Sequence, residues 1–202
     1  PIIGVDYKTG KWNFATRLEF TTHFNIENDT KRDDTGLFTD GVNTPNDLPG
    51  IWTAGIQYSV LPQVRIMGSY HYYFDKDAKM ADNKQKLLGG NTMEFLCGAE
   101  WDITKNLLVS AGCQRTQYNL GDGSYLTDMS FVTSSNSYGF GAKFKVMKNA
   151  SVNIAYFFTN YEHKKKEYDQ TIVEGEKEIK VQNTDDFTRT NKVLGVGLDI
   201  DL

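Results

Sequence analysis

Hydrophobic and polar residues alternate with a period of two along most of this chain. In "KWNFATRLEFTTHF", from Lys11 to Phe24, the even positions are mostly apolar and the odd positions are mostly polar. This alternation predicts a β-strand with one apolar and one polar face, and no stretch has the spacing of a convincing amphipathic helix. The pattern predicts nine strands in all, at residues 2–8, 11–26, 51–59, 63–75, 92–103, 107–118, 136–147, 151–161 and 193–202.

The predicted connections alternate between short turns and long loops. The short turns lie at 9–10, 60–62, 104–106 and 148–150, and the long polar loops span 27–50, 76–91, 119–135 and 162–187. Within the last loop, residues 164–181 have the pattern of a further hairpin, which would add two strands. Short turns at one end of the strands and long loops at the other are typical of bacterial outer-membrane β-barrels.

Aromatic and charged residues indicate which face points outward. On the apolar face, aromatic residues gather near both strand ends. They are Tyr7, Trp12, Tyr58, Trp101 and Phe144 near the short turns, and Phe24, Tyr72 and Phe74 near the long loops. Two such girdles are typical of membrane interfaces, whereas the many charges of the opposite face would each cost several kcal/mol in a dry core. We therefore expect an all-β fold, an antiparallel transmembrane β-barrel with its apolar face toward lipid and a hydrated lumen.

Composition and charge narrow the class further. The chain has 202 residues and a formal net charge of −4, which gives no electrostatic support for a nucleic-acid partner. It contains no apolar run near the ~20 residues that a transmembrane helix needs. We expect one barrel domain over residues 1–202. Because single-chain bacterial barrels have even strand numbers, we also expect at least one strand to precede Pro1, so that the chain is the C-terminal part of a larger barrel.

One segment carries a resemblance to a known family. In "DLPGIWTAGIQYSVLPQVRIMGSYHYYFDKD", residues 47–77, the dipeptide Leu48-Pro49 precedes a strand with a Gly-x-x-Tyr motif, Gly55 to Tyr58, and a tight turn leads into a Tyr-rich strand. Units such as "NLLVSAGCQ" fit the same pattern. The chain thus resembles the C-terminal part of the long-chain fatty acid transporter (FadL-like) outer-membrane proteins. The resemblance implies a barrel of roughly fourteen strands around an N-terminal plug, with the plug and the first strands outside this chain.

The same resemblance implies a function and a location. It implies passive transport of hydrophobic small molecules, long-chain fatty acids or aromatic hydrocarbons, across the bacterial outer membrane. The alternative is a non-transporting or general-porin barrel that acts through its long extracellular loops. The expected partners are outer-membrane lipid, the hydrophobic ligand and the barrel-insertion machinery, which would read a final strand that ends in Leu202 instead of an aromatic residue. We expect no enzymatic activity, because His163 lies in a Lys-rich loop and the other two histidines have no obvious Ser or Asp neighbour at matching depth for nucleophilic catalysis.

The lumen face supplies the candidate ligand-binding residues. They are Arg17, Glu19, His23, Arg65, His71, Glu94, Glu100, Lys143, Lys145 and Asp199. Five charged residues near the short turns are expected at similar depth, namely Arg65, Glu100, Asp102, Lys145 and Asp199. They could contact polar groups of a substrate or plug, or they could pair with one another as a salt-bridge belt, in which each exposed pair contributes only ~0–1 kcal/mol. Glycines on the same face leave room for a passage. They lie at 98, 112, 139, 141, 195 and 197.

Two smaller groups have an alternative chemical interpretation. His23 and His71, with Met67 nearby, are of the residue types that ligate haem, but their spacing does not require it, and we expect no cofactor and no metal site. Cys97 and Cys113 share the apolar face and lie opposite one another across a short turn. They are compatible with a disulfide in an oxidising compartment and with two small apolar residues that fit between larger neighbours.

Overall fold

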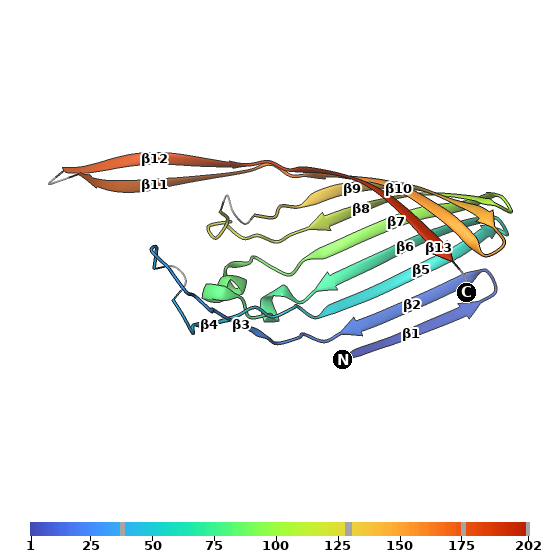
Figure 1. Ribbon diagram of the computed structural model, residues 1–202, viewed down its shortest axis with the longest axis horizontal. Coiled ribbons are helices and arrows are strands. Elements are labelled where there is room, and N and C mark those ends of the chain that lie inside the picture. Colours follow the sequence, from blue (N-terminus) through green and yellow to red (C-terminus); the bar gives the residue numbers. More distant parts are fainter. Residues whose placement is uncertain (37–38, 128–130, 175–176, 201–202) are drawn as a thin grey trace.

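The computed structural model describes residues 1–36, 39–127, 131–174 and 177–200. Over these residues the chain forms a large curved antiparallel sheet, with its long loops gathered at one end (Figure 1). The nine strands of this sheet, in spatial order, are β1 (Ile2–Thr9), β2 (Trp12–Glu19), β5 (Ile51–Leu61), β6 (Val64–Tyr73), β7 (Met93–Thr104), β8 (Leu107–Gln117), β9 (Ser135–Met147), β10 (Ala150–Tyr161) and β13 (Thr190–Ile200). The predicted meander of nine antiparallel strands is confirmed, and β1 and β13 lie at the two edges of the sheet.

The predicted strand at 11–26 is the one whose extent differs clearly from the structure. β2 ends at Glu19, and the chain then leaves the ladder with β5. The residues that follow Glu19 form their hydrogen bonds elsewhere. Thr22 forms an isolated bridge with Leu48, and the hydroxyl of Thr21 accepts a hydrogen bond from the N–H of Gly50. A short strand, β3 (Asn25–Glu27), then pairs with β4 (Asn43–Pro45) in a separate small sheet.

The hairpin expected at 164–181 is present and is longer than predicted. β11 (Lys164–Glu174) and β12 (Lys177–Phe187) form their own two-stranded sheet, and residues 175–176 at its tip lie outside the described residues. The hairpin projects well beyond the other loops (Figure 1). Its base is anchored, because the Nζ of Lys166 donates to the carbonyl oxygens of Ser124 and Leu126 at 2.7 and 3.1 Å.

The short connections at the other end are two-residue turns. They occupy 10–11, 62–63, 105–106 and 148–149, which shifts or shortens the predicted turns by about one residue. Gly10 has a φ of +55°, a left-handed conformation that glycine adopts at little cost. Tight turns of this kind fix the register of each hairpin, so that Gly98 of β7 lies opposite Gly112 of β8.

The apolar face of the sheet points outward, as predicted. Trp12, Trp101 and Leu198 are 42%, 52% and 62% exposed. On the opposite face the side chains of Arg65 and Glu94 are only 22% and 12% exposed, because they pair with neighbours inside the curved wall. A sheet with an apolar exterior and a charged interior has the arrangement of a transmembrane β-barrel.

Tight packing is concentrated in the loops. Among the described residues, the buried hydrophobic side chains are those of Ala78, Leu126 and Phe187, all at the loop end of the sheet. Two short 3₁₀ helices, η1 (Asp75–Asp77) and η2 (Ala81–Leu87), lie in the loop between β6 and β7.

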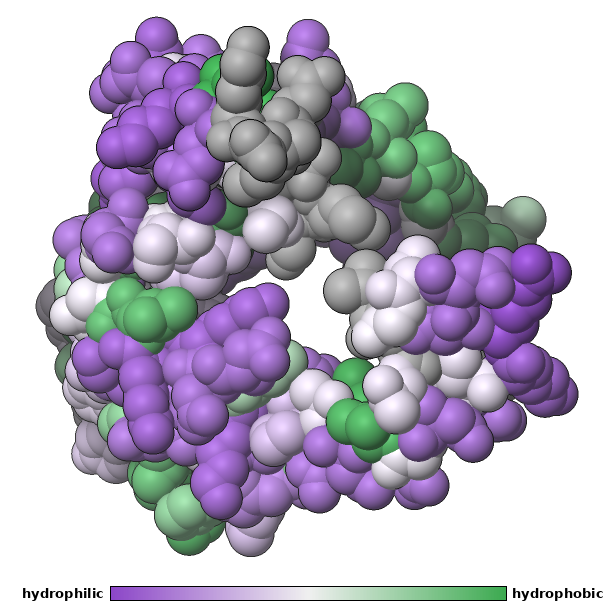
Figure 2. All heavy atoms as spheres, turned by 90° about the vertical axis from the view of Figure 1, so that its left-hand side faces the viewer, coloured by the Kyte–Doolittle hydropathy of each residue, from purple (hydrophilic) through white to green (hydrophobic). Residues whose placement is uncertain are grey.

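Seen from the loop end, the wall and its loops surround a central opening whose visible rim is mainly hydrophilic (Figure 2). No helix within the described ranges is long and apolar enough to cross a membrane.

Candidate ligand groove on the lumen face

Strand register places small and uncharged residues in two adjacent rows across the lumen face. Each row runs from strand to strand at one depth. The first row consists of Asn13, Gln57, Met67, Gly98, Gly112, Gly139 and Phe157, and the second of Ala15, Gly55, Ser69, Leu96, Gln114 and Ser137. Because glycine, alanine and serine dominate these rows, the wall is recessed there.

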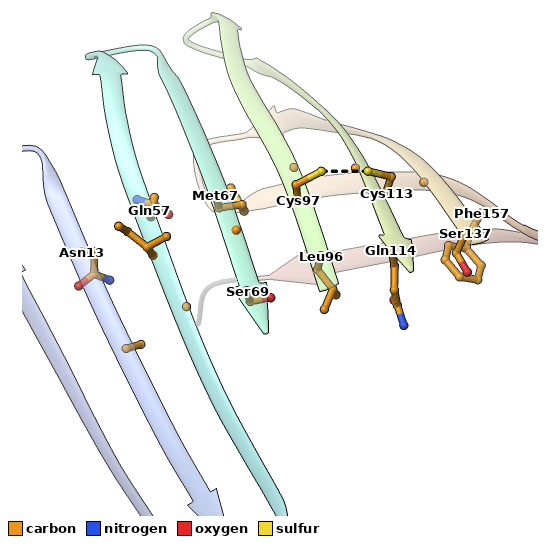
Figure 3. Close-up of a pocket in the computed structure, with 17 residues that line it drawn as sticks. Asn13, Gln57, Met67, Ser69, Leu96, Cys97, Cys113, Gln114, Ser137 and Phe157 are labelled. Atoms are coloured by element: carbon orange, nitrogen blue, oxygen red, sulfur yellow. Dashed lines mark hydrogen bonds between the residues drawn. The ribbon is translucent and has the colours of Figure 1, made fainter. Parts of the chain in front are cut away.

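The two rows line a groove of about 440 Å³ (Figure 3). Apolar surface comes from Met67, Leu96 and Phe157, and hydrogen-bonding groups come from Gln57 and Gln114. None of the residues that line the groove is charged. A recess that is mostly apolar and has a few convergent polar groups is typical of sites for small molecules.

Two glycines of the lumen face, one in the groove and one beside it, leave little room for a side chain. A Cβ on Gly112 would lie 3.0 Å from the carbonyl oxygen of Cys97. Further toward the short turns, a Cβ on Gly141 would lie 2.7 Å from the hydroxyl of Ser110. A neighbouring recess of about 400 Å³ shares Met67 and Phe157 with the groove and extends to Glu100.

Charged residues flank the groove on its turn side. Arg65 on β6 donates from Nε to Glu100 at 3.0 Å and from Nη1 to Asp102 at 2.7 Å, both on β7. Around the wall, Lys143 on β9 donates to Asp199 on β13 at 2.9 Å. Asn153, on the intervening strand β10, donates to the same carboxylate at 2.9 Å. These contacts link neighbouring strands in the part of the wall between the groove and the short turns.

A second cluster flanks the groove on its loop side and is centred on Glu94 of β7. One carboxylate oxygen of Glu94 accepts a hydrogen bond from the hydroxyl of Tyr73 at 2.9 Å and lies 3.0 Å from Nδ1 of His71. The other accepts from Gln114 at 2.8 Å and from Thr116 at 2.9 Å. The carboxylate therefore joins β6, β7 and β8, and Gln114 connects this cluster to the groove.

The remaining predicted residues lie outside these two clusters, although Arg17 is at the same register level as His71 and Glu94. Arg17 pairs with Glu19 on its own strand at 2.6 Å, and Lys145 lies beside the turn at 105–106 with an exposed side chain. His23 lies in the segment after β2, where its Nδ1 is 2.7 Å from the carboxylate of Asp47. None of the ten predicted residues lines the groove itself. The pairing of Arg65 with Glu100 and Asp102 agrees with the salt-bridge belt, whereas Asp199 pairs with Lys143. Direct contact of the ten residues with a ligand stays a prediction.

Asp47 is a buried residue that anchors the loops, a role that was not predicted from the sequence. Its side chain is 3% exposed and accepts hydrogen bonds from the backbone N–H groups of Phe24 and Lys79. The hydrogen bond from Lys79 is the main reason that the pKa of the Asp47 carboxyl lies below its ordinary value, with a further contribution from His23, while burial opposes the shift. Asp47 thus joins the segment after β2 to the loop that contains η1 and η2.

The structure does not bring the haem candidates into one cluster. His71 lies against Glu94 and His23 against Asp47, in different parts of the chain. Across the described ranges, no three His, Cys, Asp or Glu residues are placed to hold a metal ion.

Several groove residues were not predicted from the sequence, among them Asn13, Gln57, Gln114 and Phe157. Phe157 was visible in principle, because it is a large aromatic residue on a face of β10 that is otherwise polar or small. Gln57 and Gln114 had no distinctive local signal. Only the register of several consecutive hairpins places them in the two adjacent rows of the groove.

The fold and the groove together define the wall of a transmembrane β-barrel with an uncharged recess in its lumen face. No protein-family model matches the sequence, and no curated protein sequence matches it significantly. Solved structures do match, over 99% of this chain. One is a FadL homologue from Pseudomonas aeruginosa, with a TM-score of 0.70 and 11% identity over 51% of that chain. Another is the P. putida toluene transporter TodX, with a TM-score of 0.56 and 13% identity over 48% of that chain.

These similarities confirm the predicted resemblance at the level of the fold. The chain has the architecture of part of a FadL-type barrel, and it spans about half the length of each of the two matched structures. A nine-stranded sheet with two edges agrees with a partial barrel of this kind.

Proposed function

We propose that this chain forms part of an outer-membrane barrel that transports hydrophobic small molecules passively. The observation that carries the proposal is the groove of about 440 Å³, lined by uncharged residues and flanked on both sides by charged ones. Such a groove can hold an apolar molecule, while the paired charges around it keep the rest of the lumen hydrated.

The proposed substrates are long-chain fatty acids or aromatic hydrocarbons. Met67, Leu96 and Phe157 offer apolar contact to an acyl chain or a ring. The groove offers no cation to a carboxylate, and the nearest arginine on its turn side, Arg65, already holds two carboxylates. This part of the wall would therefore contact the apolar portion of a ligand. The fold shared with a FadL homologue and with a toluene transporter supports the same class of cargo.

The proposed location is the bacterial outer membrane. Exposed apolar side chains cover the outer face of the sheet, and Trp12, Tyr58 and Trp101 lie near the short turns, where an aromatic girdle is expected. Outer-membrane lipid and the barrel-insertion machinery are the proposed partners. Leu202, which bears on recognition by that machinery, lies outside the described residues.

The proposal is tested by uptake in cells. Isotope-labelled fatty acid and labelled toluene are supplied to a strain with the gene, a deletion strain and a complemented strain. Transport predicts that uptake of at least one compound falls in the deletion strain and recovers on complementation. Equal uptake in all three strains would reject transport and favour the alternative, a barrel that acts through loops such as the β11–β12 hairpin.

A further inference from the structure

The two cysteines of the chain lie directly opposite each other on neighbouring strands. Cys97 on β7 is the register partner of Cys113 on β8, and their Sγ atoms are 2.9 Å apart (Figure 3). Directly opposite residues of antiparallel strands have Cα atoms about 4.5–5.5 Å apart, which falls within the range that disulfides span. A bond between the two sulfurs therefore requires no displacement of the strands.

Both thiols are accessible and lie on the outer face. Each cysteine is exposed, and alternation along β7 places Cys97 on the same face as the exposed residues Phe95 and Trp101. The chain contains no other cysteine, so that within it each thiol has a single possible partner.

The cysteine pair lies directly behind the groove, where the wall has few side chains. On the lumen face the adjoining register pair is Gly98 with Gly112, and the next pair on the outer face is Ala99 with Ala111. Cross-strand side-chain contacts are the main source of stability in a sheet, and glycine in a strand weakens it. A covalent link at this depth would compensate for that weakness without filling the recess.

We propose that Cys97 and Cys113 form a cross-strand disulfide in the mature protein. Each thiol loses its proton, one S–S bond forms, and the two electrons reduce the disulfide of a thiol oxidase, which leaves as a dithiol. This inference rests on the proposed outer-membrane location, because a protein on that route passes through an oxidising compartment. The link would brace the β7–β8 part of the groove wall.

Peptide mapping of the intact protein tests the proposal. Cells of a Gram-negative host are quenched in acid, free thiols are blocked, and the protein from the outer-membrane fraction is digested with trypsin without reduction. Cleavage after Lys105 separates the two cysteines, so a disulfide yields peptides 87–105 and 106–115 as one cross-linked species. Reduction should release both peptides. The Cys97→Ser variant should instead yield a singly blocked peptide 106–115.

The outcomes separate this inference from the proposed function. Two blocked thiols in protein that resides in the outer membrane would reject the disulfide and leave transport untouched. Blocked thiols in protein found in another fraction would reject both the disulfide and the proposed location.

Discussion

The guanidinium of Arg65 on β6 donates a hydrogen bond to the carboxylate of Asp102 on β7 at 2.7 Å. The same side chain also donates to Glu100, so one cation is shared by two carboxylates on the neighbouring strand. This relationship is characteristic of the charged clusters in the wall. The clusters connect neighbouring strands on the turn side and on the loop side of the groove. No charged residue lines the groove itself.

The Arg65→Ala variant should be less stable than the parent protein. It leaves Glu100 and Asp102 close together without their shared cation, and because both are partly exposed, screening limits the cost to about 1 kcal/mol. Urea unfolding in detergent, followed by tryptophan fluorescence, measures the change. Arg17→Ala is a matched control, because Arg17 is 52% exposed and pairs only along its own strand with Glu19. A larger loss for the control would contradict the assigned role of Arg65.

Filling the groove should reduce transport. Ser69→Phe adds an aromatic ring to the recess between Gly55 and Leu96. Overfilling a packed site costs about 1–3 kcal/mol, which corresponds to a roughly 5- to 150-fold loss of ligand affinity. Labelled-substrate uptake should fall accordingly at equal amounts of protein in the membrane.

Ala99→Phe is the matched control for the groove. Ala99 is exposed on the outer face of β7, so its ring would point away from the lumen. Uptake by this variant should equal that of the parent. If the two variants lose uptake equally, the groove is not the path of the substrate.

Replacing Glu94 with Gln should weaken the wall on the loop side of the groove. The carboxylate accepts hydrogen bonds from Tyr73, Gln114 and Thr116, and an amide retains an acceptor at only one of its two terminal atoms. Leaving a buried donor without a partner costs about 1–3 kcal/mol. The free energy of unfolding measured by urea titration should fall by that amount, whereas Glu27→Gln, at an exposed position in β3, should not change it.

The loops around Asp47 should loosen in acid. Because folding lowers the pKa of this carboxyl, its contribution to stability is complete above the ordinary value of about 3.9 and is lost as the pH falls below it. Hydrogen exchange, corrected for intrinsic rates, should therefore accelerate at residues 20–27 and 75–80 as the pH falls from 5 to about 2.5.

The Asp47→Asn variant provides the control for this pH dependence. Asparagine cannot titrate, so exchange in these loops should be faster than in the parent at pH 5 and nearly independent of pH. An unchanged pH response in this variant would assign the effect to another group.

The strands and the direction of their faces could be predicted from the sequence because both are local properties. Alternation such as that from Trp12 to Leu18 sets the two faces of a strand, and the cost of burying Arg17 or Glu94 determines which face meets water. The residue at which β2 ends, Glu19, could not be predicted in this way. It depends on Thr22 and Gly50, which bond to segments that are distant in sequence.

The sequence by itself determined that this protein is an antiparallel barrel wall with an apolar exterior, since period-two alternation and loop length are written along the chain. Only the tertiary structure decided which residues share one depth. The row from Gln57 through Met67 and Gly98 to Phe157 exists because several hairpin registers add together across the sheet. A shift of one residue in any of them would turn a strand's side chains to the opposite face.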